Sequence, residues 1–209
     1  MKILILGGFL GSGKTSVLLQ LAEYLVSLEK EYHSEVKVAI VENEIGAIGI
    51  DDKVLKKAGF IVNNLFSGCA CCSLTGELVA SIKKIQTELD PQWLIIEATG
   101  VAYPGSIRKV ILDEVGIDAT ILIIADAKRW QRLVNAMELL VTGQLEDTSI
   151  VLLNKVDLIS SAELKQVEHS ILNYNQTAEV IPISAKAVIQ EDILKKIVNQ
   201  AEDLYDNKA

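Results

Sequence analysis

The sequence predicts one α/β domain built on a mainly parallel β-sheet with helices on both faces. Three observations support this prediction. The chain of 209 residues is long enough for one sizeable core. Its apolar residues, 50% of the total, are mostly Leu, Ile, Val and Ala, which suits strands buried on both sides. Short apolar runs also alternate with longer stretches of helical period, and this alternation favours parallel pairing.

Seven strands and six helices are expected, and the three prolines stand singly at or near their boundaries. The strands are predicted at Lys2–Leu6, Val36–Glu42, Phe60–Leu65, Trp93–Glu97, Ala119–Asp126, Ser149–Asn154 and Glu179–Ile183. The helices are predicted near Lys14–Lys30, Leu74–Glu88, Gly105–Val115, Lys128–Thr142, Ser161–Tyr174 and Glu191–Tyr205. The first helix has an apolar stripe that can pack on a sheet, formed by Leu18, Leu21, Ala22, Leu25 and Leu28.

The charge and hydropathy of the chain exclude two broad classes of partner. The formal net charge is -8 and the calculated isoelectric point about 4.9, so the chain repels a phosphate backbone and no nucleic-acid partner is expected. No apolar run approaches the roughly 20 residues that cross a bilayer, so no membrane span is expected either. These features predict a cytoplasmic protein.

A phosphate-binding loop follows the first predicted strand. Residues 8–15 read GFLGSGKT, which fits the pattern G-x-x-x-x-G-K-[ST] with a strand before it and a helix after it. The glycines allow backbone N–H groups to surround a phosphate at a helix N-terminus. Lys14 is expected to reach the β- and γ-phosphates and Thr15 to bind Mg²⁺. The predicted nucleotide contacts are Gly11, Ser12, Gly13, Lys14, Thr15 and Ser16.

A guanine pocket is predicted at the end of the sixth strand, where residues 154–157 read NKVD. The Asp157 carboxylate can accept hydrogen bonds from N1–H and the N2 amine of guanine, and adenine lacks this pair of donors. Lys155 is expected to cover one face of the base, and Asn154 to tie the pocket to the phosphate loop. Further along, Ser184, Ala185 and Lys186 form a loop whose backbone N–H can meet guanine O6.

The fourth strand ends in a candidate Mg²⁺ and γ-phosphate sensor, with residues 97–100 reading EATG. Glu97 is placed to hold Mg²⁺ through its water shell, and the N–H of Gly100 can approach the γ-phosphate. The predicted catalytic residues are therefore Lys14, Glu97 and Gly100. Asp126, at the end of the fifth strand, is expected to be a hydrogen-bonding support.

The segment after the second strand has the position of a first switch loop. Glu42 and Glu44 would point the same way if the strand extends that far, and both are candidate ligands near the Mg²⁺. A polar loop with glycine hinges is the alternative.

Three cysteines, Cys69, Cys71 and Cys72, lie within four residues of each other. A disulfide between such close neighbours would be strained, whereas clustered thiolates suit Zn²⁺ or another thiophilic metal. The candidate ligands are all three sulfurs with a fourth ligand, which could be Glu44, water, a partner or a second copy of the chain, or two of the sulfurs with other ligands. Buried unreactive cysteines and a redox pair are the alternatives.

These motifs together resemble the CobW-type metallochaperone GTPases, in the class that also contains HypB and UreG. The resemblance rests on GGFLGSGKT, on NEIG followed by GID, and on GCACC, EATG and NKVD, and it covers nearly the whole chain. It implies a P-loop NTPase fold of the SIMIBI type. Residues 1–209 are expected to form the GTPase domain alone, without the second, C-terminal domain of most relatives. The chain departs from the family pattern at Ala47 and Tyr103, where relatives usually carry acidic residues.

The resemblance implies a GTPase that binds GTP with Mg²⁺, loads a transition metal through its cysteines and releases the ion to a client on hydrolysis. Zn²⁺ is the first candidate, and Co²⁺ and Ni²⁺ are the others. Expected partners are GTP or GDP, a client metalloprotein or cofactor-assembly enzyme, and a second copy of the chain. Alternatives are a regulatory GTPase without metal cargo, a small-molecule kinase and a thiol redox sensor. Hydrolysis by the isolated chain is expected to be slow.

Overall fold

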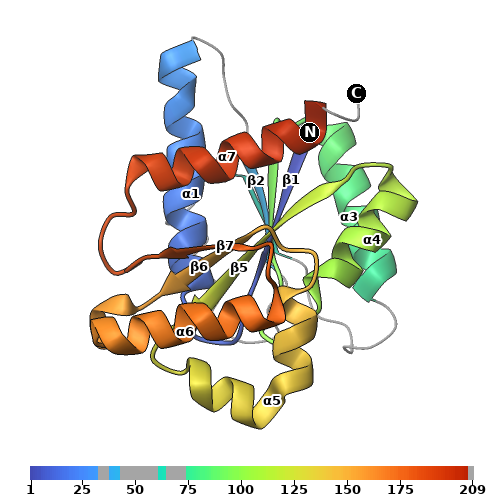
Figure 1. Ribbon diagram of the computed structural model, residues 1–209. Coiled ribbons are helices and arrows are strands. Elements are labelled where there is room, and N and C mark those ends of the chain that lie inside the picture. The colour runs from blue at the N-terminus through green and yellow to red at the C-terminus, as the bar shows by residue number, and fades with distance from the viewer. Residues whose placement is uncertain (33–37, 43–60, 65–73, 207–209) are drawn as a thin grey trace.

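The computed structural model describes residues 1–32, 38–42, 61–64 and 74–206. Figure 1 shows the arrangement of its elements. The strands are β1 (Lys2–Gly7), β2 (Val38–Glu42), β3 (Ile61–Asn64), β4 (Trp93–Glu97), β5 (Ala119–Asp126), β6 (Ile150–Asn154) and β7 (Glu179–Pro182). The helices are α1 (Lys14–Tyr32), α3 (Leu74–Glu88), α4 (Pro104–Val115), α5 (Trp130–Leu145), the short 3₁₀ helix η1 (Val156–Leu158), α6 (Ser161–Tyr174) and α7 (Glu191–Asp206). Each predicted strand and helix is present, with small shifts at the ends.

The described strands form one seven-stranded sheet in the order β3-β2-β4-β1-β5-β6-β7. All of its neighbouring strands are parallel, as predicted. β1 pairs with β4 on one side and with β5 on the other, so Ile3 lies between Leu94 and Ala119. The order of strands along the chain reverses at β1, and ligands of such sheets bind outside the carboxyl ends of the strands at that point.

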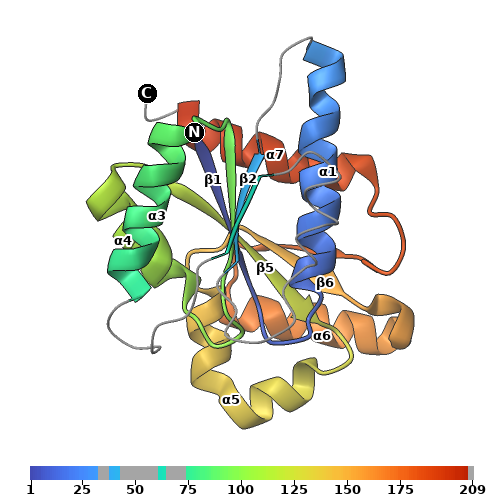
Figure 2. The ribbon, with the colours of Figure 1, turned by 180° about the vertical axis from the view of Figure 1, so that it is seen from behind.

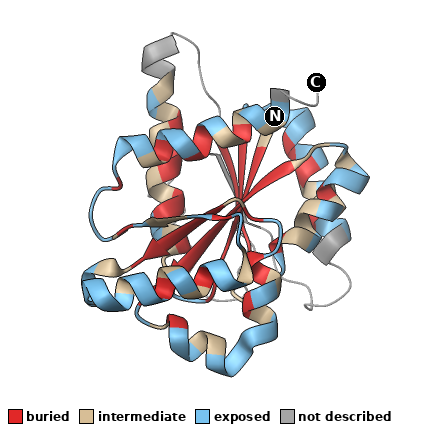
Figure 3. Ribbon diagram, viewed as in Figure 1, coloured by how far each residue is buried: buried red, intermediate tan, exposed pale blue. Residues whose placement is uncertain are grey.

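Helices cover both faces of the sheet, because successive side chains of each buried strand point to opposite sides. Ile3 and Ile5 face the apolar core beneath α3, α4, α5 and α6. Leu4 and Leu6 face a second core beneath α1 and α7. Figure 2 shows the fold from behind, and Figure 3 shows buried strands between helices whose outer faces are exposed. None of the helices in the described ranges is long and apolar enough to cross a membrane.

α5 is bent at Met137, where the backbone leaves helical geometry (φ -146°, ψ 46°). The bend is visible in Figure 1, and the helical period predicted no interruption there. Met137 is neither a proline nor a glycine, so the bend does not come from one of these residues at that position. The second half of α5 ends with Gly143, Gln144 and Leu145, and the first two contact the loop after β4.

Candidate nucleotide-binding site

The loop between β1 and α1 has a backbone that favours glycine at three positions. Gly8, Gly11 and Gly13 have φ values of 130°, 71° and 102°, which L-residues rarely adopt. A Cβ on Gly8 would overlap the carbonyl oxygen of Ile124 in β5, and one on Gly13 would overlap the amide nitrogen of Asn154 in β6. The loop therefore lies directly against the ends of two neighbouring strands, and its glycines permit that close approach.

Lys14 is buried at the centre of this loop, with only 3% of its surface exposed. Its Nζ donates to the carbonyl oxygens of Gly8 (3.1 Å) and Phe9 (3.4 Å). Ser12 is fully buried, and its hydroxyl has no hydrogen-bond partner among the described residues. A buried hydroxyl without a partner is unfavourable, and a phosphate oxygen bound in the loop would supply an acceptor. The residues of the loop thus fit a phosphate group.

Thr15 in the first turn of α1 and Glu97 at the end of β4, the two residues predicted to share Mg²⁺, lie next to each other. The Thr15 Oγ1 lies 3.2 and 3.3 Å from the two carboxylate oxygens of Glu97, whose side chain is buried. β4 is held beside the phosphate loop by parallel pairing with β1 and by the bond from the Ala98 N–H to the Leu6 carbonyl (2.9 Å). A hydroxyl beside a carboxylate is the kind of oxygen donor set that suits Mg²⁺.

The loop after β4 passes close to the phosphate loop. A Cβ on Gly100 would lie 2.6 Å from the backbone nitrogen of Leu10, so glycine allows this approach. The buried side chain of Gln144 in α5 donates from Nε2 to the carbonyls of Gly100 (3.1 Å) and Ala102 (3.2 Å). The ring of Tyr103 fills the space that a side chain at Gly143 would need. The end of α5 therefore supports the loop that contains Gly100.

The predicted base-binding motif is joined to the phosphate loop by Asn154. Its Nδ2 donates to the carbonyl of Ser12 (2.8 Å), and its Oδ1 accepts from the backbone N–H groups of Lys155 and Ala185 (2.8 Å each). Asp157 is exposed in the middle of η1, and its carboxylate accepts a hydrogen bond from the Ser184 hydroxyl (2.7 Å). The predicted pocket residues from β6 and from the loop after β7 are thus adjacent in the structure.

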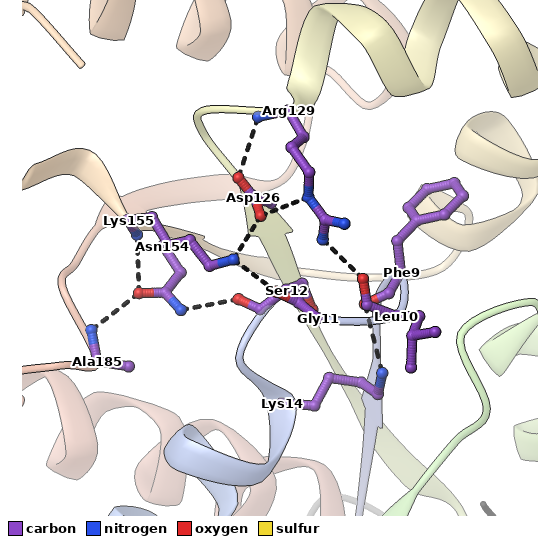
Figure 4. A network of polar contacts seen from close by, with 10 residues as sticks. All are labelled: Phe9, Leu10, Gly11, Ser12, Lys14, Asp126, Arg129, Asn154, Lys155 and Ala185. Atoms are coloured by element: carbon purple, nitrogen blue, oxygen red, sulfur yellow. Dashed lines mark hydrogen bonds and ion pairs between the residues drawn. The ribbon is translucent and has the colours of Figure 1, made fainter. Parts of the chain in front are cut away.

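Asp126 has the supporting role that the sequence suggested, through the network drawn in Figure 4. Its buried carboxylate binds the Nε of Arg129 (2.7 Å) and the Nζ of Lys155 (2.6 Å). Both cations also bind the outer side of the phosphate loop, because Arg129 donates to the Leu10 carbonyl and Lys155 to that of Gly11 (2.6 Å each). Burial raises the pKa of the Asp126 carboxyl, but the hydrogen bonds from Lys155 and Arg129 outweigh it and hold the pKa below its ordinary value.

Two residues of this site, Arg129 and Gln144, were not predicted from the sequence. Arg129 stands outside every motif, and 119 positions separate it from the Leu10 carbonyl that it binds. Gln144 is an isolated amide in a helix of apolar period, 44 positions from Gly100. A single sequence carries no signal for either contact, because both depend on which strands are neighbours.

The predicted metal ligands of the switch and cysteine segments lie largely outside the described residues. Glu44, Cys69, Cys71 and Cys72 are in the ranges that the structure does not describe. Glu42 is the last residue of β2, where the backbone register pairs it with Glu97. Their roles as ligands therefore stay predictions.

Comparisons with known proteins agree with this geometry. A family model described as "CobW/HypB/UreG, nucleotide-binding domain" matches residues 2–182. The zinc chaperone YjiA of Escherichia coli (strain K12) is 28% identical over 193 residues, covering 87% of this chain and 57% of that protein. The zinc-regulated GTPase metalloprotein activator 1 of Dictyostelium discoideum is 24% identical over 237 residues, covering 93% of this chain and 48% of that protein. The chain thus spans about half the length of these relatives.

Solved structures share the fold. The crystal structure of HypB from Helicobacter pylori in complex with nickel superposes with a TM-score of 0.69 and 18% identity, covering 98% of this chain and 89% of the other. The crystal structure of Zn(II)-bound YjiA GTPase from E. coli superposes with a TM-score of 0.63 and 21% identity, and the match covers 92% of this chain and 60% of the other. At these identities the likeness shows the fold.

Proposed function

Because the chain belongs to the CobW/HypB/UreG family of P-loop GTPases, we propose that it hydrolyses GTP and uses the GTP-bound and GDP-bound states to bind and release a transition metal. The observation that carries the nucleotide part is the connection between the two halves of the site. The Asn154 amide bonds the Ser12 carbonyl of the phosphate loop and the Ala185 N–H of the base-binding loop (2.8 Å each). One nucleotide can therefore contact both motifs at once.

The described residues would have separate roles in GTP binding and hydrolysis. The Lys14 ammonium would neutralise charge on the β- and γ-phosphates, and Thr15 with Glu97 would hold Mg²⁺, which spreads the developing negative charge during transfer. Gly100 lies against Leu10, and its N–H would donate to the γ-phosphate. Asp157, oriented by Ser184, would accept from the two guanine donors and would have unpaired oxygens opposite adenine.

The metal part of the proposal rests on the chemistry of the cysteine segment and on the relatives. Thiolates from Cys69, Cys71 and Cys72, with Glu44 as a further candidate, suit a thiophilic divalent ion. Two relatives bear the printed names "zinc chaperone" and "zinc-regulated GTPase metalloprotein activator". We therefore propose Zn²⁺ as the first cargo, with Co²⁺ and Ni²⁺ as the other candidates. A cytoplasmic client metalloprotein or cofactor-assembly enzyme would receive it.

Nucleotide state and metal affinity should be linked, because the cysteine segment lies in the chain between the Glu42 strand and the Glu97 strand. If GTP changes the affinity for the metal, the metal must change the affinity for GTP by the same factor. Thiolate ligands lose their protons on binding, so the affinity should also fall in acid.

A competitive metal titration tests this proposal on the reduced protein with Mg²⁺ and either GDP or a non-hydrolysable GTP analogue. Tight binding of Zn²⁺ that requires the GTP analogue and is weakened by Cys71→Ser is the expected result. Ser73→Ala is the matched control, since it changes the same segment without removing a thiol. Binding that is absent, or that is indifferent to both nucleotide and Cys71, would overturn metal delivery. A regulatory GTPase without metal cargo would then be favoured.

A further inference from the structure

Gln20 joins the helix of the phosphate loop to the loop that faces the base. It lies on α1, six residues after Lys14, and its side chain is half-buried. Its Nε2 donates to the carbonyls of Ala185 and Ala187 (3.2 Å each), and its Oε1 accepts from the N–H of Ile189 (2.7 Å). Three backbone groups of one loop are therefore held by one side chain, and no sequence motif includes this residue.

The chemistry of the contact requires an amide. A glutamine amide offers two N–H donors and a carbonyl acceptor, which match two backbone carbonyls and one backbone N–H. A carboxylate at position 20 would keep the acceptor and lose both donors, and an apolar side chain would lose all three bonds. No other natural side chain of the same length provides both the two donors and the acceptor of these three hydrogen bonds.

The loop that Gln20 holds contains the residues that organise the guanine pocket. Its Ser184 hydroxyl orients Asp157, and its Ala185 N–H binds Asn154. Asn154 thus fixes the loop from the β6 side, and Gln20 fixes it from the α1 side. The N-terminus of α1 carries Lys14 and Thr15, so the distance between the phosphate and base sites is set in part by this contact.

We propose that Gln20 is a positioning residue for guanine recognition, which acts by holding residues 184–189 where their backbone reads the oxygen at position 6 of the base. This inference rests on the proposed function, because it assigns a further determinant of guanine binding to the same site. Gln20 would act through the loop. Its loss should therefore weaken the contact with the base much more than the hydrolytic step.

The test compares GDP with 6-thio-GDP, which has sulfur in place of O6 and is otherwise identical. Dissociation constants are measured by calorimetry for the full chain with Mg²⁺, in wild type, Gln20→Met and Gln20→Glu. Methionine keeps the length of the side chain and removes all three hydrogen bonds. Ser27→Ala is the matched control, since Ser27 is exposed on the same helix and its hydroxyl bonds only the Tyr24 carbonyl (2.7 Å).

For Gln20→Met we expect GDP affinity to fall by about tenfold, the effect of roughly one to two lost hydrogen bonds. The affinity for 6-thio-GDP should fall less, so the preference for GDP over 6-thio-GDP shrinks. The KM for GTP should rise by a similar factor while kcat stays within about twofold, as for a residue that affects binding in ground and transition states alike. Gln20→Glu should behave in the same way, and Ser27→Ala should match wild type.

Two results would overturn the inference. The first is an affinity for GDP in folded Gln20 variants that equals that of wild type. The second is an equal loss of both ligands, which would mean a general structural role. Folding is checked by circular dichroism, and Gln20→Glu provides the measurement if Gln20→Met does not fold. Failure of the wild type to bind GDP would be a different result, since it would refute the proposed function itself.

Discussion

At the scale of single residues, the buried carboxylate of Asp126 stabilises the phosphate loop through two cations. The carboxylate is almost completely buried and binds two cations, and each cation also donates to a carbonyl of the phosphate loop. Burying a carboxylate without partners would be costly, whereas charged hydrogen bonds offset that cost. The network stabilises the phosphate loop through the carbonyls of Leu10 and Gly11. It does not use the side chains of Ser12 and Lys14.

Asp126 should make stability depend on pH in a defined direction. Its pKa is lower in the folded protein than in the unfolded chain. Its stabilising contribution is therefore complete above the ordinary carboxyl pKa of about 3.9 and is lost as the pH falls through the lower, folded value. Asp126→Asn should reduce the free energy of unfolding at neutral pH by about 2 kcal/mol, the effect of lost hydrogen bonds to charged groups.

Urea unfolding of both proteins, from neutral pH into the acid range, measures this effect. The difference between wild type and Asp126→Asn should narrow as the pH falls below the ordinary carboxyl value. Asp113→Asn, on the exposed face of α4, is the control and should leave stability unchanged. A constant difference at all pH values would show that the carboxylate charge of Asp126 does not stabilise the fold.

At the scale of elements, the end of α5 is the support of the loop that contains Gly100. Gln144 donates two hydrogen bonds to this loop, and Tyr103 occupies the space above Gly143. The helix is bent at Met137, and its second half carries these contacts. A loop held by a packed helix keeps a fixed position, which a sensor of the γ-phosphate requires.

Gln144→Leu should slow GTP hydrolysis without weakening GDP binding. The substitution removes both bonds to the carbonyls of Gly100 and Ala102, and the γ-phosphate that Gly100 would contact is absent from GDP. A loss of about 1.4 kcal/mol in the transition state corresponds to roughly a tenfold lower kcat. Single-turnover hydrolysis and GDP titration measure the two quantities.

Gln131→Leu is the matched control for that experiment. Gln131 lies on the same helix but is exposed, and among the described residues its Nε2 bonds only the side chain of Asn135 (2.9 Å). This variant should hydrolyse GTP at the wild-type rate. Equal kcat values for Gln144→Leu and wild type would mean that the support of the Gly100 loop by α5 does not affect hydrolysis.

At the scale of the whole molecule, a bound nucleotide should connect the loop after β1, where the strand order reverses, with the loops after β6 and β7. The phosphate loop follows β1 and the predicted base-binding residues follow β6 and β7, so a ligand that contacts both would stabilise the folded state as one unit. At a GDP concentration of about 100 Kd the stabilisation is roughly 2.7 kcal/mol. For a domain of this size that corresponds to an increase in Tm of about 5–10 °C.

Thermal unfolding with Mg²⁺ and GDP, compared with Mg²⁺ and ADP, checks this expectation. GDP should raise Tm and ADP should have little effect, because adenine lacks the two N–H donors from which Asp157 would accept hydrogen bonds. Asp157→Asn should abolish the increase with GDP at the same concentration. An equal increase with ADP and GDP would contradict guanine specificity and favour a kinase-like or adenine-binding function.

The sequence by itself determined the elements and the local motifs. Apolar runs and helical periods predicted the strands and helices, because each pattern depends on residues only a few positions apart. The phosphate loop and the Asn154–Asp157 motif were predicted for the same reason, since each is a short segment whose backbone and side chains act together. The match of the family model to residues 2–182 confirms the resemblance that these motifs suggested.

Only the tertiary structure decided which residues support those motifs. Arg129 with Leu10, Gln144 with Gly100, and Gln20 with Ala185 are separated by 119, 44 and 165 positions. Each pair meets because β1 lies between β4 and β5 and because α1 packs on the same face as α7. Alternating strands and helices do not specify that order, and hydrogen bonds between distant residues leave no periodic trace in one sequence.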